Sequence, residues 1–288
     1  MIDFLKYKYL YLAISSIVIV AGLISIVTFG FRYSIDFVGG TNLQYQFSRP
    51  VDLNKVRTIF TKDGIEVIRL EENNAVISAR TKAIDEKREL VLKNDLTNTL
   101  GVTLKVLLSE TVGPVLGQET LIKTLIASGI AILGILIYMS FAFKSFNFAL
   151  AAIVALVHDF LVVVGSYSIL SHFFGAELDT MFVTAVLTAM SFSVHDTIVI
   201  FDKIREYKRT EGISNIAHSA NEALTETLVR SLNNSMTIIF MLLALTLLGG
   251  STIRFFVATL LIGTITGTYS SPFVATPVLV WLEKRRSK

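Results

Sequence analysis

The sequence has no cysteine, only four prolines and a single tryptophan among its 288 residues. Without thiols the chain cannot form disulfides, thiolate metal sites or a cysteine nucleophile. Charge is also scarce, because Asp, Glu, Lys and Arg make up 17% of the residues, whereas a soluble domain usually carries about 25%. A chain that is 52% hydrophobic with a mean hydropathy of +0.63 is therefore expected to lie largely in a membrane.

Motifs for nucleotide and metal chemistry are missing as well. The sequence contains no GxxxxGK[ST] loop and no kinase or hydrolase signature, so we expect no ATP-driven step on this chain. No His-Glu-x-x-His motif or carboxylate pair has ligand spacing, and we predict no metal site and no cofactor. The net charge of +3 comes from short basic flanks rather than from a face for nucleic acid. These absences favour a membrane component that is not an enzyme.

Long apolar runs dominate what is present. A membrane-spanning helix needs about 20 apolar residues. Six such segments are predicted, at approximately 9–31, 120–142, 147–170, 180–201, 228–249 and 254–282. The first ends in Thr28-Phe-Gly-Phe-Arg32, which is not a small-x-small cleavage site, so we expect an uncleaved span rather than a signal peptide.

The basic residues assign an orientation to these spans. With the N-terminus inside, eleven Lys and Arg residues flank the inner ends, and the short outer loops around 171–179 and 249–254 contain only Arg254. The inner residues are Lys6, Lys8, Lys144, Lys203, Arg205, Lys208, Arg209, Lys284, Arg285, Arg286 and Lys288. Because positive charge accumulates on the cytoplasmic side, both termini are predicted to be cytoplasmic.

Residues 33–118 have the composition of a soluble domain and are predicted to lie outside the membrane. Strands are expected at 34–47, 65–70, 75–80 and 102–106, with helices after Asp52 and at 85–100. Gly39 and Gly40 interrupt the first strand as a bulge or a close backbone approach. The order is βαββαβ, a ferredoxin-like α+β unit. The predicted fold is a polytopic α-helical membrane protein with six transmembrane helices and this extracytoplasmic domain between the first two.

The chain is thus expected to divide into residues 1–32, the external domain 33–118, and residues 119–288 with the remaining spans. An amphipathic cytoplasmic helix is predicted near 213–228, packed under the helical bundle. Its apolar stripe consists of Ile213, Ile216, Ala217, Ala220, Leu224 and Leu228, with Asn221, Glu222 and Glu226 on the opposite side.

The segment Thr188–Arg209 carries a carboxylate, Asp196, within an apolar span. On insertion scales an Asp at the centre of a spanning helix costs about 2.5–3.5 kcal/mol, so such residues usually face a bundle interior and mark a pathway or relay. The alternative is that Asp196 only bonds a neighbouring helix, or lies near enough to the cytoplasmic surface to stay hydrated. Asp159 lies about halfway along the third span.

Arg230 enters the fifth span from the cytoplasmic side and is expected at a depth similar to that of Asp196. An arginine stays charged and would favour the ionised form of a neighbouring carboxylate, so this pair could open and close with protonation. Arg230 could equally be an interface anchor. For His158 and His195 we expect hydrogen bonds rather than metal binding.

Several motifs together resemble the SecF proteins of the SecD/SecF family, the accessory complex of the bacterial Sec translocon, which is related to the resistance-nodulation-division (RND) superfamily. The matching segments are Ser34–Thr41, Val112–Glu119, Ala155–Asp159, Ser193–Glu206 and Arg230–Ser235. Ser34 replaces a glycine of the family pattern, His195 stands where Asn is usual, Lys203 replaces Arg, and Asn233-Asn234 replaces an apolar residue and a Thr.

The resemblance implies that Asp196 and Arg230 are the membrane acid and base of proton coupling, and we assign His195 and Asp159 to the same predicted site. His195 would relay protons itself or only replace the amide. Structural roles are predicted for the matched motif residues Asp36, Gly39, Gly40, Thr41, Asp202 and Arg205.

The resemblance further implies a function in which the proton motive force assists export of preproteins across the bacterial cytoplasmic (inner) membrane. It implies SecD, the SecYEG translocon and unfolded preproteins as partners within the lipid bilayer, and leaves YajC and YidC open as further ones; nucleic acid is not expected. The alternatives are an RND-type proton-driven exporter of small molecules or lipids, and an assembly factor whose charges only hold helices together. An RND exporter typically has a larger external domain than the roughly 85 residues here.

Overall fold

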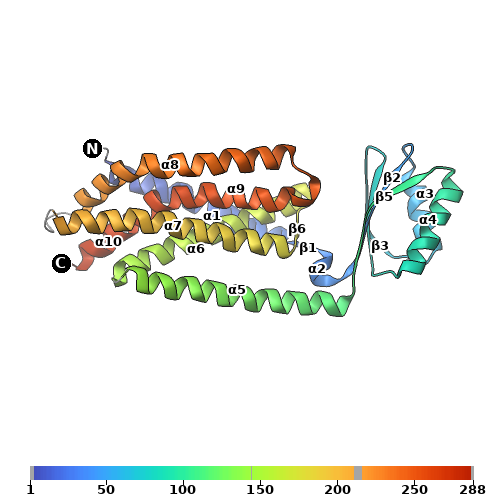
Figure 1. The fold of residues 1–288 in the computed structure, drawn as a ribbon, viewed down its shortest axis with the longest axis horizontal. Coiled ribbons are helices and arrows are strands. Elements are labelled where there is room, and N and C mark those ends of the chain that lie inside the picture. The colour runs from blue at the N-terminus through green and yellow to red at the C-terminus, as the bar shows by residue number, and fades with distance from the viewer. Residues whose placement is uncertain (1–2, 144, 211–215, 287–288) are drawn as a thin grey trace. The chain divides into compact units, whose positions relative to one another are not determined.

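A computed structural model describes residues 3–143, 145–210 and 216–286. The chain divides into two compact units, one made of Met1–Arg32 with Ala127–Lys288 and the other of Tyr33–Ile126. The first contains the membrane helices and the second contains the main β-sheet (Figure 1).

The secondary structure follows the chain in this order. The helices are α1 (Lys8–Phe29), α2 (Ile35–Val38), α3 (Leu53–Lys62), α4 (Glu86–Leu100), α5 (Pro114–Phe143), α6 (Phe146–Phe174), α7 (Thr180–Thr210), α8 (Ile216–Leu248), α9 (Ser251–Ser270) and α10 (Thr276–Arg286), with a 3-10 turn η1 (Phe4–Tyr7) and a π-helical turn η2 (Ser271–Ala275). The strands are β1 (Arg32–Tyr33), β2 (Gly40–Phe47), β3 (Val67–Asn73), β4 (Val76–Thr81), β5 (Leu104–Val112) and β6 (Glu177–Leu178).

Within the described residues, six helical segments are long and apolar enough to cross a membrane, which confirms the predicted spans. The central helix is α6, because 61% of its most apolar stretch is buried within the chain, against 6% for α5 and 11% for α8. Both termini and the start of α8 lie at the same end of the helical unit (Figure 1). The apolar surfaces of α5 and α8 are therefore free to meet lipid or another protein.

Glycines allow two pairs of these helices to pack closely. A side chain on Gly22 of α1 would come within 2.8 Å of the Cα atom of Gly165 on α6. On α9 a side chain at Gly267 would come within 2.9 Å of Ser193 Cβ on α7, and Gly263 is similarly tight against Ala189. The Gly263–Gly267 pair therefore packs within this chain, as small-xxx-small motifs do in membranes.

The last span is not a single regular helix. Alpha-helical geometry stops at Ser270, and Ser271–Ala275 forms a π-helical turn before α10 begins. Pro272 lies in the first turn of this segment and has no N–H group to donate. The irregularity therefore falls at a proline, and Ser270 and Ser271 at its start are both fully buried in the bundle.

The predicted amphipathic helix near 213–228 is not separate from the fifth span. Helix α8 is continuous from Ile216 to Leu248, and residues 213–215 lie outside the described part of the chain. Asn221, expected on the polar side, is instead buried with 6% exposure. Its side chain accepts a hydrogen bond from the backbone of Leu5 and donates one to Asp3 (2.9 Å). The N-terminal segment covers this residue, which sequence periodicity does not reveal.

The second unit, Tyr33–Ile126, has the predicted ferredoxin-like topology. Its four strands are antiparallel in the order β3-β4-β2-β5, so the first and third strands of the βαββαβ unit are central. Helices α3 and α4 supply one side of the core and the strands supply the other. The buried side chains are Leu43, Tyr45, Phe47, Val56, Ile59, Phe60, Ile65, Ile77, Ala79, Ile84, Leu92, Leu96 and Val102.

The expected first strand begins later than the alternating pattern indicates. Residues Ile35–Val38 form a short helix capped by the Ser34 hydroxyl, which accepts a hydrogen bond from Asp36 N, and β2 begins only at Gly40. Gly39 lies at φ +75° and ψ 169°, and a side chain there would come within 2.7 Å of Pro114 Cα. Gly40 would meet the carbonyl oxygen of Thr81 at 2.8 Å. The two glycines thus form the close backbone approach.

Replacing Gly39 by Ala should destabilise the α+β unit. The φ and ψ values are ones that essentially only glycine adopts, at a cost of about 1–3 kcal/mol for other residues, and the new methyl group overlaps the Pro114 backbone. We expect a lower thermal unfolding midpoint for the full-length protein in detergent. Gly113→Ala is the matched control, since a side chain there meets nothing within 4 Å. Equal midpoints for the two variants would contradict this account of the glycine pair.

Candidate functional site

A buried carboxylate lies at the centre of the helical unit. Asp159 on α6 is 3% exposed and accepts hydrogen bonds from two hydroxyl groups on its Oδ2 atom, those of Ser193 on α7 and of Ser270 at the end of α9 (2.7 Å). Its Oδ1 atom pairs with Nδ1 of the neighbouring His158 at 2.8 Å. Residues on α6, α7 and α9 therefore supply the hydrogen bonds that this carboxyl group needs, because a buried polar group in a membrane must find its partners within the protein.

More hydroxyl groups continue this polar seam toward the π-helical turn. The hydroxyls of Thr197 on α7 and Ser271 on η2 are hydrogen-bonded at 2.8 Å, and both are buried. A backbone carbonyl oxygen lies within reach of each hydroxyl, that of Ser193 for Thr197 (3.1 Å) and that of Gly267 for Ser271 (3.1 Å), so one hydroxyl donates to the other and the second donates to its carbonyl. At this position α7 is joined to η2 in the last span by hydrogen bonds between side chains.

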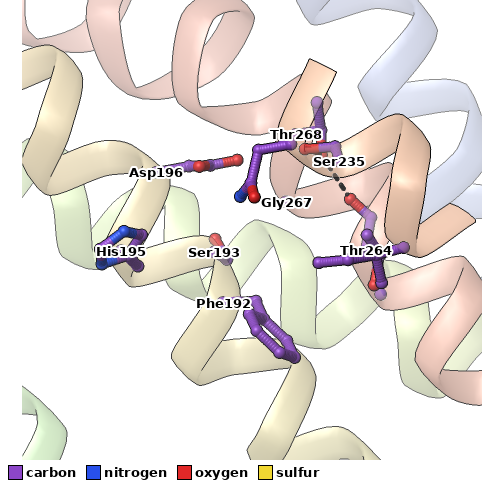
Figure 2. Close-up of a pocket in the computed structure, with 11 residues that line it drawn as sticks. Phe192, Ser193, His195, Asp196, Ser235, Thr264, Gly267 and Thr268 are labelled. Carbon is purple, nitrogen blue, oxygen red and sulfur yellow. Dashed lines mark hydrogen bonds between the residues drawn. The ribbon is translucent and has the colours of Figure 1, made fainter. Parts of the chain in front are cut away.

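Asp196 lies in a pocket between α7, α8 and α9. The pocket is small, and its lining consists of Phe192, Ser193, His195, Asp196, Asn234, Ser235, Ile238, Gly263, Thr264, Gly267 and Thr268. Figure 2 shows Asp196 and Ser193 on the side of α7 that faces Gly267 and Thr268, whereas His195 points away from them. Across the pocket, Thr268 donates a hydrogen bond to Ser235 (2.8 Å).

The two acids differ in their surroundings. Asp196 is half-buried and has Ser231 of α8 as a polar neighbour, while Asp159 is enclosed. Ser193 belongs to both places, because it lines the pocket of Asp196 and also donates to Asp159. The arrangement brings one accessible and one inaccessible carboxyl group to the same turn of α7.

Arg230 and His195 lie at the edge of this arrangement. Both are exposed in the chain, and Arg230 is one turn from Asn234, which lines the pocket. Among the described residues, no ion pair within 4.0 Å joins Arg230 to Asp196. The expected pair is therefore open in this structure, with the guanidinium on the outer surface of α8.

The motif residues Asp202 and Arg205 have definite contacts. Arg205 forms an ion pair with Asp202 and donates to the carbonyl oxygens of Ala142 and Phe143, at 3.4 and 3.0 Å. These carbonyls belong to the last turn of α5, where they have no partner within the helix. Arg205 therefore ties the end of α5 to α7.

Two further motif residues, Asp36 and Thr41, belong to the α+β unit Tyr33–Ile126. The backbone of Asp36 forms the cap of α2. Thr41 is fully buried, and its hydroxyl accepts a hydrogen bond from Ile84 N (3.0 Å) and bonds that of Thr111 (2.9 Å). Thr41 thus fastens the start of β2 to β5 and to the chain that follows β4.

Across residues 3–143, 145–210 and 216–286, no three His, Asp or Glu side chains converge as metal ligands. The chemistry that the buried groups can perform is the binding and transfer of protons. Sequence reasoning did not identify Ser270 and Ser271 as part of the site. The signal for them is a pair of hydroxyl residues directly before Pro272 inside an otherwise apolar span.

Comparison with known proteins shows which family has this sequence and fold. Residues 91–285 match the family described as "Protein export membrane protein SecD/SecF, C-terminal", and residues 24–51 match the SecD/SecF GG motif. The chain belongs to the SecD/SecF family. The GG motif contains Gly39 and Gly40, whose close backbone contacts are described above.

SecF proteins match this SecD/SecF chain over nearly its whole length. A protein translocase subunit SecF of Thermobaculum terrenum is 41% identical over 99% of this chain and 95% of its own length. That of Anaerolinea thermophila is 36% identical over 97% of this chain and 94% of its own. Within the family the chain is a membrane transport component rather than an enzyme.

A solved structure has the same fold. The crystal structure of SecDF, a translocon-associated membrane protein from Thermus thermophilus, is similar with a TM-score of 0.85 at 30% identity, over 99% of this chain. The chain spans 39% of that SecDF chain. The SecD/SecF chain described here therefore corresponds to less than half of a SecDF assembly.

The buried carboxyl should contribute to the stability of the helical unit. Asp159→Leu leaves the buried Ser193 hydroxyl without its acceptor, at about 1–3 kcal/mol for an unsatisfied group, whereas Ser270 can still donate to the carbonyl oxygen of Gly267 (3.3 Å). Asp159→Asn keeps one acceptor oxygen and should lose less. The measurement is thermal unfolding of the full-length protein in detergent, with the exposed Glu206→Gln as the control. A Leu variant as stable as the wild type would show that these bonds do not hold the bundle.

Proposed function

We propose that this chain is the SecF-type subunit of a SecDF complex and assists the export of proteins across a membrane. The observation that carries the proposal is the match to SecF proteins along almost the full chain, in sequence and in fold, including both units. The absence of a nucleotide motif in the sequence agrees with an ion gradient as the energy source. One proton that crosses 100 mV yields about 2.3 kcal/mol, so a few protons suffice for one mechanical stroke.

Proton coupling is proposed at Asp196, with Arg230, His195 and Asp159 as its partners. Support comes from the half-buried Asp196 in a polar pocket and from the enclosed Asp159 one helix away. Arg230 remains charged at any physiological pH. A swing of its long side chain toward the pocket would bring it to Asp196 when that acid is ionised, and release it when the acid is protonated.

A second membrane subunit is proposed to cover α8. This helix is poorly buried, yet it exposes Arg230, Asn233 and Asn234 in a membrane-spanning segment. Polar groups exposed to lipid are costly, so these side chains favour contact with another protein. The 39% share of the SecDF structure leaves room for a SecD partner in the same assembly. SecYEG, with YajC or YidC beside it, and unfolded preproteins are proposed as further partners.

The proposed location is the bacterial cytoplasmic membrane, with both termini in the cytoplasm and the ferredoxin-like unit outside. Support comes from the basic residues at the end of the bundle that holds both termini. Lys208 pairs with Glu283 (2.5 Å), and Lys203 pairs with Glu226 (3.0 Å). This end also contains Arg205, so positive charge gathers on one side of the membrane.

Asp196→Asn should abolish the part of export that depends on the proton gradient, because the amide cannot exchange a proton. The measurement is preprotein export into inverted membrane vesicles, with and without a protonophore. Glu206→Gln on the same helix is the control, since this acid is exposed. Wild-type gradient-dependent export by Asp196→Asn would sink the coupling role and favour an assembly factor whose charges only hold helices together.

A further inference from the structure

We infer that the Ser193 hydroxyl conducts protons between the pocket of Asp196 and the buried carboxyl of Asp159. Asp159 is then an inner proton-binding site that is reached only through α7. The inference rests on the proposed proton coupling and names the connection within it. It starts from the geometry of one side chain, which is a member of the pocket lining and of the buried cluster at once.

On the inner side, Ser193 is in direct contact with its acceptor. It is 2% exposed and donates to Asp159 Oδ2, the same atom that Ser270 binds at 2.7 Å. The other oxygen of Asp159 is occupied by His158. Within the described residues, the Ser193 hydroxyl is therefore the one bonded neighbour of Asp159 that also reaches the pocket.

On the outer side, Ser193 and Asp196 are three residues apart on α7 and so occupy the same face of the helix. Both line the pocket, and Figure 2 shows them on the same side of α7, toward Gly267. Gly267 also keeps Ser193 in place, because even a methyl group on this glycine would come within 2.9 Å of Ser193 Cβ. The hydroxyl is thus held where it can serve two neighbours.

The transfer step balances without any other reactant. The Ser193 hydroxyl passes its proton to the Asp159 carboxylate, and the serine oxygen takes a proton from the pocket side, where Asp196 is the donor. Serine is neutral before and after, Asp196 ends ionised and Asp159 ends protonated. Reversal of both O–H exchanges returns the proton.

The imidazole of His158 follows Asp159 in this cluster, and one of its ring nitrogens has no hydrogen-bond partner. His158 is 7% exposed, its Nδ1 is bound to Asp159, and its Nε2 is buried without a hydrogen-bond partner. The other ionisable groups that face this cluster are Asp196 on α7 and Tyr269 on α9, whose ring lies 6.5 Å from that of His158. On α1, the carbonyl oxygen of Tyr11 accepts a hydrogen bond from the Tyr269 hydroxyl. The polar side chain that η2 contributes is the hydroxyl of Ser271, which does not ionise. His158 is thus placed to share the proton.

The competing role for Ser193 is purely structural, as one of several hydroxyls that hold membrane helices together. The chain offers a matched comparison for it. Ser270 donates to the same Asp159 oxygen from another helix but does not line the pocket. A structural role predicts equal effects of Ser193→Ala and Ser270→Ala, whereas conduction predicts a loss that is specific to Ser193→Ala.

The test measures deuterium exchange of the protonated Asp159 carboxyl by infrared spectroscopy, on the full-length chain in phospholipid vesicles. Asp159→Asn assigns the carbonyl band. Because a positioned proton-transfer group is worth about 10²–10⁴-fold in rate, we expect Ser193→Ala to slow the exchange by at least about ten-fold. Ser270→Ala should exchange at nearly the wild-type rate.

Wild-type exchange in Ser193→Ala, or equal slowing in both alanine variants, would overturn the inference. Ser25→Ala, which removes a buried serine–serine bond (3.0 Å) between α1 and α6, controls for general loosening. If Ser193→Ala does not fold, Ser193→Cys is the second variant, because it keeps a similar volume and a weak S–H donor. Its Asp159 carboxyl should exchange at a rate between those of the wild type and of a variant without a donor. A wild-type exchange rate in Ser193→Cys would also contradict the inference. The readout does not depend on export, so a failure here is distinguishable from a failure of gradient-driven export in Asp196→Asn.

Discussion

A carboxyl group enclosed by membrane helices must receive its hydrogen bonds from the protein, because hydrocarbon supplies none. Asp159 meets this requirement through Ser193 on α7, Ser270 on α9 and His158 on its own helix. The two serine bonds fix the distance and rotation of α7 and α9 relative to α6. The packing of the bundle interior follows from this constraint as much as from apolar contact.

Small residues make that geometry attainable. The hydroxyl groups of α7 and α9 can reach one carboxyl only if the two backbones approach closely, and Gly263 and Gly267 permit this where any side chain would collide. The π-helical turn that follows inserts an extra residue and turns Ser271 toward Thr197. Such turns interrupt α-helices frequently at functional sites, and here the turn completes the polar seam.

The side chains on the outside of the bundle differ from those in its interior. Most of the surface of α5 and α8 is apolar, as lipid contact requires, but α8 also carries Arg230 and two asparagines outward. One acid lies in a pocket, a second acid lies behind it, and Arg230 is exposed on α8, so the groups of the proposed proton coupling are separate in this chain. The proposed partner subunit that covers α8 would bring them together.

The amino-acid sequence by itself determined the six spans, the βαββαβ order and the family motifs. These depend on local composition, on helix and strand periodicity and on short runs such as the one that ends in Asp196, all of which are visible without a fold. The need for partners around Asp159 also follows from its position in an apolar span.

Which partners those are was decided only by the tertiary structure. Ser193 and Ser270 lie 34 and 111 residues from Asp159 in the chain. Asn221 is buried because the N-terminus covers it, and Ile35–Val38 is helical because Gly39 must turn against Pro114. Local patterns report what a segment can form alone, whereas these outcomes arise from contacts between distant segments, which only the folded chain brings together.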